Sequence, residues 1–276
     1  MAVPAFLLFA LFFLYPLSQG IWMSLTDWDG ISRANFIGLR NFFDFFKDDR
    51  AMADIRNTLL FALGSAPLLN LVGLGYALLM NGKFRGKSAA RVMIYLPAII
   101  SPLIMGYIWY MLLQPDRGFL AHALELIGKS QWLGNWLGDY GACMVLLILV
   151  NVWQYAGMTM VIYLAGLQSI PEELYESAKI DGAGFRDSFR YVTIPMLLPS
   201  IRINVVTNII GSLAVFDIVM ALTDGGPGYS TETLSIYIMR MCYGSKTGYS
   251  TAVAIIMFFI ILIPVMISMR LTREKE

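Results

Sequence analysis

The chain has 276 residues, of which 58% are hydrophobic and only 14% are charged, whereas soluble domains carry about 25% charged residues. So few charged side chains cannot cover the surface of a soluble protein of this size, which argues against a soluble enzyme, a disordered chain and a secreted disulfide scaffold. The net charge of +1 offers no basic surface to nucleic acid. Cys143, Cys242 and His122 provide neither a metal-ligand spacing nor a disulfide framework.

Uncharged stretches long enough to cross a membrane follow one another along the chain. A helix needs about 20 residues to cross a hydrocarbon core of about 30 Å. We predict an all-α integral membrane protein, a single transmembrane domain over 1–276, with six transmembrane helices at about 3–25, 57–81, 92–113, 141–167, 203–222 and 248–269. The first stretch lacks the basic start and the small-residue cleavage site of a signal peptide, and five similar stretches follow it.

Lys and Arg residues are distributed unequally between the connecting segments. The segments form two alternating sets. The first set is 81–91, 168–202 and 270–276, and the second is 25–56, 114–141 and 223–250. Lys and Arg residues are denser in the first set. Because basic residues gather on the cytoplasmic side of membrane proteins, we predict that the N-terminus and the C-terminus are both cytoplasmic. The strongest contribution comes from a basic cluster in the first set: Lys83, Arg85, Lys87 and Arg91. A short cytoplasmic extension before Met1 is compatible with this orientation.

The segment 168–200, between the fourth and fifth predicted spans, has the pattern of a helix, a turn and a second short helix. Ser169 and Glu172 have the spacing of a capping box that would start the first helix, with Pro171 in its first turn. Glycines would form the turn, and prolines would end the second helix before the next span; they are Gly182, Gly184, Pro195 and Pro199.

The first of these two helices differs from an amphipathic helix that lies on a membrane surface. A surface helix carries a broad apolar face and a polar face rich in Lys and Arg. This helix has several acidic residues and only Lys179 as a base, and one of its faces carries small side chains. A membrane-surface linker is the alternative, but the pattern favours contact with a protein partner.

The same residues carry a resemblance to a known family. The resemblance lies in Glu176–Ala178, Gly182 and Val192–Pro195. These residues are similar to the Glu-Ala-Ala, Gly and Ile-x-Leu-Pro signature of binding-protein-dependent ABC importer permeases. The stretches 175–184 and 222–233 are more specifically similar to carbohydrate permeases of the maltose and glycerol-phosphate type. The chain departs from the signature, by small changes, at three positions: Ser177, Val192 and Ile194.

The resemblance implies a permease subunit of an ATP-driven importer, which forms half of the membrane pathway for a carbohydrate and alternates between inward-open and outward-open states. It implies a second homologous permease subunit, two ATPase subunits that hold ATP and Mg, and an extracytoplasmic solute-binding protein, in the cytoplasmic (inner) membrane of a bacterium. The segment 168–200 would be a coupling loop whose first helix docks on an ATPase. The residues assigned to this coupling are Glu172, Glu176, Ser177, Ala178, Asp181, Gly182 and Pro195.

Polar side chains inside the predicted spans are costly in lipid, so they usually face protein or water. On the fourth span one stripe at helical spacing is formed by Asn151, Gln154, Tyr155 and Thr159. On the fifth span Asn204 and Asn208 share a face, with Ser212 a further turn on. We interpret five residues as candidate groups along the substrate pathway: Asn151, Gln154, Tyr155, Asn208 and Asp217. For the stripe, a polar seam between neighbouring helices is an equal alternative.

Asp217 lies nine residues beyond Asn208, so on a continuous helix it would point about 180° away. We therefore expect that Asp217 and Asn208 do not line one pathway. An acid that reaches the outer interface or pairs within the bundle is the alternative interpretation of Asp217.

The main rival class is a secondary transporter or channel subunit. Such proteins carry runs of ionisable residues in their spans, whereas Asp217 is the single charged residue in the six predicted spans. An intramembrane enzyme would need a second titratable group there. Gly86-Lys87-Ser88 ends like a phosphate-binding loop, but Asn81 occupies the position of the required glycine, so we predict that this chain binds no ATP and no other cofactor.

Overall fold

The computed structural model describes residues 2–82, 84–114, 118–128 and 136–271. Lys83 of the predicted basic cluster and residues 272–276 of the last predicted cytoplasmic segment lie outside these ranges. Within them the regular elements are helices, and the one strand-like pairing is an isolated antiparallel bridge between Thr26 and Phe36. The predicted all-α class is therefore confirmed for the described part of the chain.

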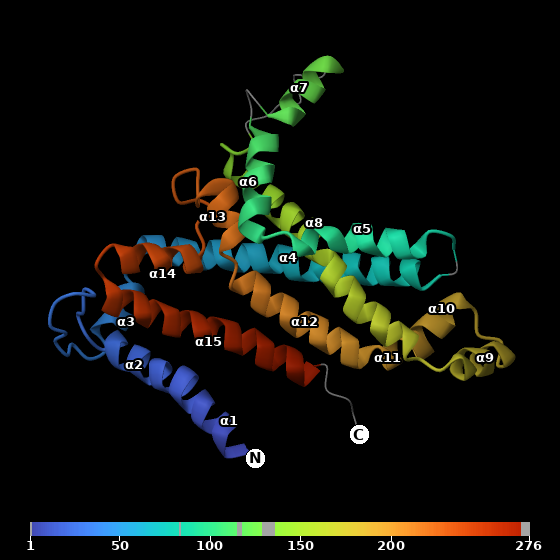
Figure 1. Cartoon of the computed structure of the whole chain (residues 1–276), viewed down its shortest axis with the longest axis horizontal. Helices are drawn as coiled ribbons and strands as arrows, with labels where there is room; N and C mark the ends of the chain where they lie inside the picture. Colours follow the sequence, from blue (N-terminus) through green and yellow to red (C-terminus); the bar gives the residue numbers. More distant parts are fainter. Residues whose placement is uncertain (1, 83, 115–117, 129–135, 272–276) are drawn as a thin grey trace.

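Four helical segments are long and apolar enough to cross a membrane. They are Val3–Ser24, α4 (Asp49–Asn81), α8 (Tyr140–Gln168) and α15 (Thr247–Leu271). Two further pairs of helices would cross only as bent spans, so the described ranges contain between four and six candidate spans. α4 and α15 run along the length of the molecule, and α8 crosses α4 obliquely (Figure 1).

The third predicted span, 92–113, is broken in its middle. α5 (Lys87–Ile99) ends there, and α6 (Pro102–Leu113) continues at an angle of 95° to it. A proline disfavours the helical conformation in the residue before it, and Ser101 has an extended ψ of 131°. The dipeptide Ser101-Pro102 therefore separates the two helices.

The fifth predicted span, 203–222, is also interrupted. α12 (Leu198–Leu213) ends at Leu213, and α13 (Asp217–Thr223) begins after Phe216, whose φ of −137° is not helical. No proline or glycine stands between the two helices. The sequence therefore contains no local signal for this break.

Close contact between α4 and α8 forms the centre of the bundle. Gly64 lies against Ile148 and Gly73 lies against Thr159, so close that a Cβ atom at either glycine would overlap its neighbour. Small residues allow membrane helices to approach in this way. These glycines fix the spacing of the two longest helices.

The N-terminal segment consists of α1 (Ala2–Phe9), the π-helical η1 (Ala10–Leu14) and α2 (Tyr15–Ser24). α2 packs along α15, whereas α1 diverges from the rest of the molecule (Figure 1). Its apolar side chains are exposed, as Phe6 is at 62%. A surface of this kind suits contact with lipid or with another membrane helix.

Short helices lie at the two ends of the molecule (Figure 1). α3 (Arg40–Phe45) and α14 (Leu234–Tyr243) lie at one end, which we call the α14 end. α7 (Phe119–Leu126) follows α6 away from the long helices. The opposite end, which we call the α9 end, carries α9 (Glu172–Ile180), α10 (Phe185–Ser188), the π-helical η3 (Phe189–Thr193) and α11 (Ile194–Met196).

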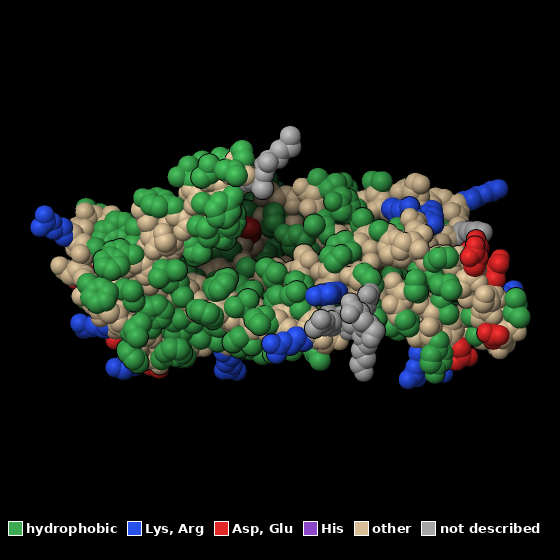
Figure 2. Space-filling view, turned by 90° about the horizontal axis from the view of Figure 1, so that it is seen from below, with side chains coloured by type: hydrophobic (Ala, Val, Ile, Leu, Met, Phe, Trp, Pro, Cys, Tyr) green, Lys and Arg blue, Asp and Glu red, His purple; other side chains and the backbone are tan. Residues whose placement is uncertain are grey.

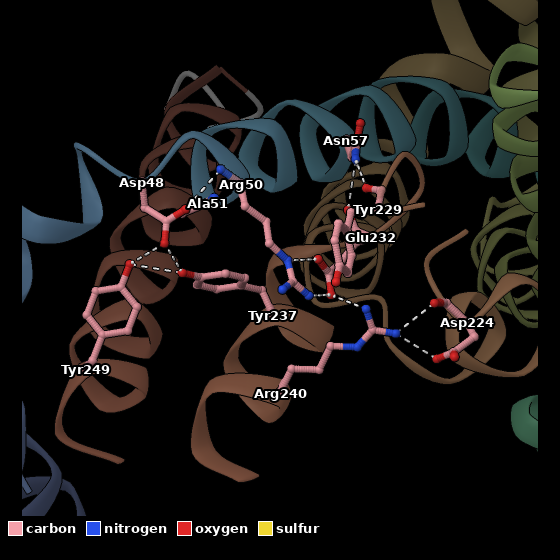
Figure 3. Close-up of polar contacts among 10 residues, drawn as sticks. All are labelled: Asp48, Arg50, Ala51, Asn57, Asp224, Tyr229, Glu232, Tyr237, Arg240 and Tyr249. Atoms are coloured by element: carbon pink, nitrogen blue, oxygen red, sulfur yellow. Dashed lines mark hydrogen bonds and ion pairs between the residues drawn. The ribbon is translucent and has the colours of Figure 1, made fainter. Parts of the chain in front are cut away.

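A fully buried carboxylate, that of Glu232, organises the α14 end (Figure 3). Arg50 donates to it from Nε at 2.7 Å and from Nη2 at 2.8 Å, and Arg240 donates from Nη1 at 2.8 Å. Arg240 also donates to the carbonyl and the carboxylate of Asp224, both at 2.8 Å. The Arg50 guanidinium stacks 3.6 Å from the centre of the Tyr229 ring. These contacts join α4, α14 and the turn that precedes α14.

Asp48 adds a second link at the same end, because it caps α4 and also binds α14 and α15 (Figure 3). Its carboxylate accepts hydrogen bonds from the hydroxyls of Tyr237 at 2.6 Å and Tyr249 at 3.4 Å, and from the backbone N–H groups of Arg50 and Ala51. Desolvation by burial is the largest single influence and raises the pKa of Asp48. The hydrogen bonds together outweigh it and hold this pKa below its ordinary value.

The ion pairs predict unequal costs for two charge-removing substitutions. Glu232→Ala leaves two guanidinium groups, each about three-quarters buried, without their shared partner. We expect the free energy of unfolding to fall by up to about 3 kcal/mol. Asp224→Asn, the matched control, changes a side chain that is 68% exposed, and we expect a loss below about 1 kcal/mol. Thermal unfolding of the purified protein in detergent measures both, and equal losses would contradict a central role for Glu232.

Candidate functional site

A cavity of about 290 Å³ lies between α8, α12 and α13. Figure 2 shows a hollow in this part of the molecule, bordered by hydrophobic side chains. The cavity wall combines apolar side chains such as Leu69 and Met158 with hydroxyl, amide and carboxylate groups. These polar residues are Asn151, Tyr155, Thr159, Asn204, Thr207, Asn208, Ser212 and Asp217. Such a mixture can bind a solute that has both apolar faces and hydroxyl groups.

Asp217 and Asn208 line the same cavity, so the expectation that they point to opposite sides is wrong. That expectation assumed one continuous helix. The chain instead leaves α12 at Leu213 and starts α13 at Asp217, and the non-helical residues between them redirect the backbone. An exposed carboxylate is thereby placed at the junction of the two helices, within the cavity wall.

The polar stripe of α8 both lines the cavity and binds neighbouring helices. Asn151 donates from Nδ2 to the Ser65 hydroxyl of α4 at 2.6 Å. Thr159 and Asn208 exchange hydrogen bonds at 3.3 to 3.4 Å, and Asn204 donates to the Thr159 carbonyl at 3.3 Å. The cavity wall and the interhelical polar seam therefore share these residues.

Gln154 does not line this cavity. Its side chain is fully buried and donates from Nε2 to the carbonyl oxygen of Ile100 at 3.1 Å, at the break between α5 and α6. The break between α12 and α13 has a similar contact, because Thr233 donates from its hydroxyl to the carbonyl of Val215 at 3.0 Å. Of the five predicted pathway residues, the structure thus brings four together and assigns Gln154 to a helix break.

Ser212 lines the cavity in addition to the predicted pathway residues. Its hydroxyl is buried and has no hydrogen-bond partner in the described part of the chain. Because an unpaired buried hydroxyl is costly, this group is available to a bound solute or to water. The polar face that Ser212 shares with Asn204 and Asn208 was the signal in the sequence.

The start of α9 differs from the prediction. The predicted capping box between Ser169 and Glu172 is wrong, because α8 continues to Gln168 and Ser169 is its C-terminal cap. The Ser169 hydroxyl donates to the Gly166 carbonyl at 2.8 Å, and Pro171 precedes the first residue of α9 without a side-chain cap. The longer helix α8 therefore uses the residue that the pattern had assigned to α9.

The predicted turn at Gly182 is confirmed. Gly182 has a φ of +81°, and its N–H donates to the Lys179 carbonyl while that of Ala183 donates to the Ala178 carbonyl. This pair of bonds is the Schellman arrangement that ends helices at a left-handed residue. A residue with a side chain would be strained at this φ even though nothing lies within 4 Å of the position where a Cβ atom would stand.

α9 presents its side chains to the surroundings, and none of them is buried. The predicted coupling residues Glu172, Glu176, Ser177 and Asp181 are exposed, and Ala178 is half-buried. In the space-filling view a group of acidic side chains lies at this end of the molecule (Figure 2). α9 therefore offers an acidic, accessible surface to a partner.

The expectation that Pro195 ends the second short helix is wrong. The helical segment runs from Phe185 through Pro195 to Met196, changing from α- to π-helix and back to α-helix at Ile194. The segment ends at Leu197, and α12 then departs at 67° with Pro199 in its own first turn.

Residues 69–274 match the family described as "Binding-protein-dependent transport system inner membrane component". The chain belongs to this family. It is therefore a multi-pass protein of the inner membrane and a permease component of ABC import, and its family is one of transport proteins rather than enzymes.

Relatives and solved structures agree with this membership over the whole chain. A probable starch degradation products transport system permease protein of Thermoanaerobacterium thermosulfurigenes is 34% identical, over 99% of this chain and 92% of the relative. The sn-glycerol-3-phosphate transport system permease protein of Yersinia pestis is 32% identical, over 100% and 93%. A chain of a bacterial alginate ABC transporter, solved in complex with an alginate pentasaccharide-bound periplasmic protein, has a TM-score of 0.84 and 26% identity, covering 99% of this chain and 92% of that one.

We predict that two size-matched substitutions, one in the cavity wall and one away from it, affect solute uptake differently. Asn208→Leu removes an amide from the cavity wall, so we expect solute uptake into vesicles to change in affinity or rate by about 2- to 10-fold, the equivalent of one hydrogen bond. Gln154→Leu removes an amide away from the cavity, so it should affect stability but not apparent affinity. An equal change of apparent affinity in both variants would contradict the assignment of the cavity to the pathway.

Proposed function

We propose that the chain forms half of the membrane pathway for a carbohydrate that an extracytoplasmic solute-binding protein delivers. The observation that carries this proposal is the cavity of hydroxyl, amide and apolar groups in a chain of this family. The names of relatives that handle starch degradation products and alginate support a carbohydrate, and a glycerol phosphate is the nearest other class. Asn151, Tyr155, Asn208 and Asp217 are the proposed solute-facing residues on this chain.

We propose six membrane spans: the four long helical segments, the bent pair α5–α6, and α12 together with α13. Both termini and the α9 end then lie in the cytoplasm, and the α14 end lies outside. α4 supports this arrangement, because its 33 residues extend about 50 Å and so exceed a hydrocarbon core of about 30 Å. Its first turns, with Arg50, can then project beyond the core into the polar network of the α14 end.

We further propose that α9 is the coupling helix and docks on a cytoplasmic ATPase. Glu172, Glu176 and Asp181 would face basic groups of that partner, and Ser177 and Ala178 would permit close approach. The absence of buried side chains on α9 supports this role, since the helix adds little to the described core. ATP and Mg would be bound and used by two ATPase subunits, whose closure would move α9 and a corresponding helix of a second permease.

The proposed assembly can be tested by its composition. Gentle extraction from the native membrane, followed by mass spectrometry, should recover this chain with an ATPase and a second permease of similar size. Retention of uptake after collapse of the ion gradients, with ATP maintained, is the expected companion result. Recovery of the chain alone under several mild conditions, together with loss of uptake when the gradients collapse, would instead support a secondary transporter.

The turn after α9 predicts an uncoupled variant. Gly182→Leu places a branched side chain at a φ of +81°, so the turn must rearrange and the docking helix must move. We expect at least a roughly tenfold loss of uptake, consistent with about 1–2 kcal/mol of backbone strain, while membrane insertion is unchanged. Gly184→Ala is the control, because Gly184 has a φ of −76° and an added Cβ atom would make only an ordinary contact with Asp187. Normal uptake by Gly182→Leu would refute the coupling role of this turn.

A further inference from the structure

α9 has few connections to the rest of the chain, and one of them involves Tyr175. The Tyr175 hydroxyl lies 3.0 Å from the Oγ1 atom of Thr193 in η3. In the described part of the chain this is the one side-chain hydrogen bond between α9 and the segment 185–196. Ile180 of α9 and Phe185 of α10 are more than four-fifths exposed.

The Tyr175 ring also anchors α9 to the core of the α9 end. It packs against a cluster of buried side chains from α4, α8 and the residues before α12. The buried members of this cluster are Ala77, Met80, Met160, Tyr163, Leu164, Leu167, Ile170 and Leu197. Tyr175 is the only residue of α9 that packs on this cluster, so ring and hydroxyl together join α9 to the bundle.

Thr193 is well placed to hold the other side of this link. It is only 5% exposed, it is the last residue of η3, and its hydroxyl also reaches the Ser188 carbonyl at 3.4 Å. When the single hydroxyl hydrogen of Thr193 points to Ser188, its oxygen accepts from Tyr175. Single π-turns within helices occur frequently at functional sites, and this one holds Thr193 towards α9.

A continuous backbone path leads from Thr193 to the cavity. The N–H of Leu197 donates to the Thr193 carbonyl at 3.0 Å, and the N–H of Ile201 donates to the Leu197 carbonyl at 2.8 Å. These bonds cross the 67° bend, and Leu197 is fully buried at its corner. Backbone hydrogen bonds therefore continue across the bend. Asn208 lies about 15 Å further along α12.

We propose that the Tyr175–Thr193 hydroxyl pair is the joint through which displacement of α9 moves α12 and thereby the cavity wall. This inference rests on the proposed function, because it assumes that an ATPase moves α9. Tyr175 and Thr193 are positioning residues, which touch neither the solute nor ATP. Without the hydrogen bond, α9 can shift along the core cluster, so only part of its displacement is transmitted to α12.

The test uses the complete importer reconstituted in liposomes with its solute-binding protein, with ATP hydrolysis and solute uptake measured on the same preparation. Tyr175→Phe keeps the ring and removes only the hydroxyl. We expect the uptake per ATP hydrolysed to fall by about 2- to 10-fold, the range for one hydrogen bond, while hydrolysis and recovery of the ATPase with this chain persist. Tyr191→Phe is the matched control, because Tyr191 lies in η3 next to the joint but is 70% exposed.

A double-mutant cycle separates a joint from a merely structural contact. Thr193→Val should lower the uptake per ATP as Tyr175→Phe does, the double variant should be no worse than either single variant, and Thr193→Ser should retain the ratio. Losses that multiply in the double variant, or a parallel loss of uptake and hydrolysis with dissociation of the ATPase, would overturn the proposal.

Gly182→Leu in the same assay distinguishes the two levels of inference. If it lowers the uptake per ATP while Tyr175→Phe and Thr193→Val do not, α9 couples to the ATPase but the hydroxyl pair is not the joint. If all three variants transport normally, the coupling role of α9 fails and the joint fails with it.

Discussion

Backbone carbonyl groups inside a membrane protein need hydrogen-bond partners from the protein itself, because lipid offers none. This constraint governs the two interrupted spans. At each interruption a polar side chain from another element donates to a carbonyl that the helix leaves free: Gln154 to Ile100, and Thr233 to Val215. The bundle can bend at both places because these contacts replace the missing helical bonds. The cavity lies beside one of the bends, so its shape depends on a partner as distant as Thr233.

Rigid and bent parts of the molecule have different contacts. α4 and α8 approach so closely at Gly64 and Gly73 that a Cβ atom at either position would overlap the facing residue. α12 has a bend at its start and an interruption at its end, and it meets α8 partly through the polar contacts around Thr159. Polar contacts of this kind can exchange partners or water more readily than packed glycines can separate. Under the proposed mechanism, α12 would be displaced against the α4–α8 pair.

The sequence predicted the features that depend on composition and on local backbone preference. Long uncharged runs identify α4, α8 and α15, and a glycine at a left-handed position identifies the turn at Gly182. Spacing also grouped Asn151 with Tyr155 on one face of α8. These predictions succeed because each depends on a short segment considered alone.

The features that depend on distant contacts were not predictable in this way. Ser101-Pro102 carried a signal for the first interruption, but nothing between Leu213 and Asp217 indicates the second. The expectation that Asp217 points away from Asn208 was therefore wrong, although a charged residue inside a predicted span had made Asp217 a candidate for the site. The link between Tyr175 and Thr193 requires a fold that brings two separate helices together, and neither hydroxyl is distinctive in the sequence.

The distance in sequence between Arg50 and Glu232 has a consequence for biosynthesis. The two residues are 182 positions apart, and the chain between them contains α5, α6, α8 and α12. Arg50 therefore remains without its buried carboxylate while all of these helices are synthesised and inserted. The ion pair can close only when the turn before α14 has arrived on the same side of the membrane as Arg50. Its formation marks a nearly complete topology, and a chain with an inverted or missing helix leaves Arg50 without Glu232, which then pairs only with Arg240.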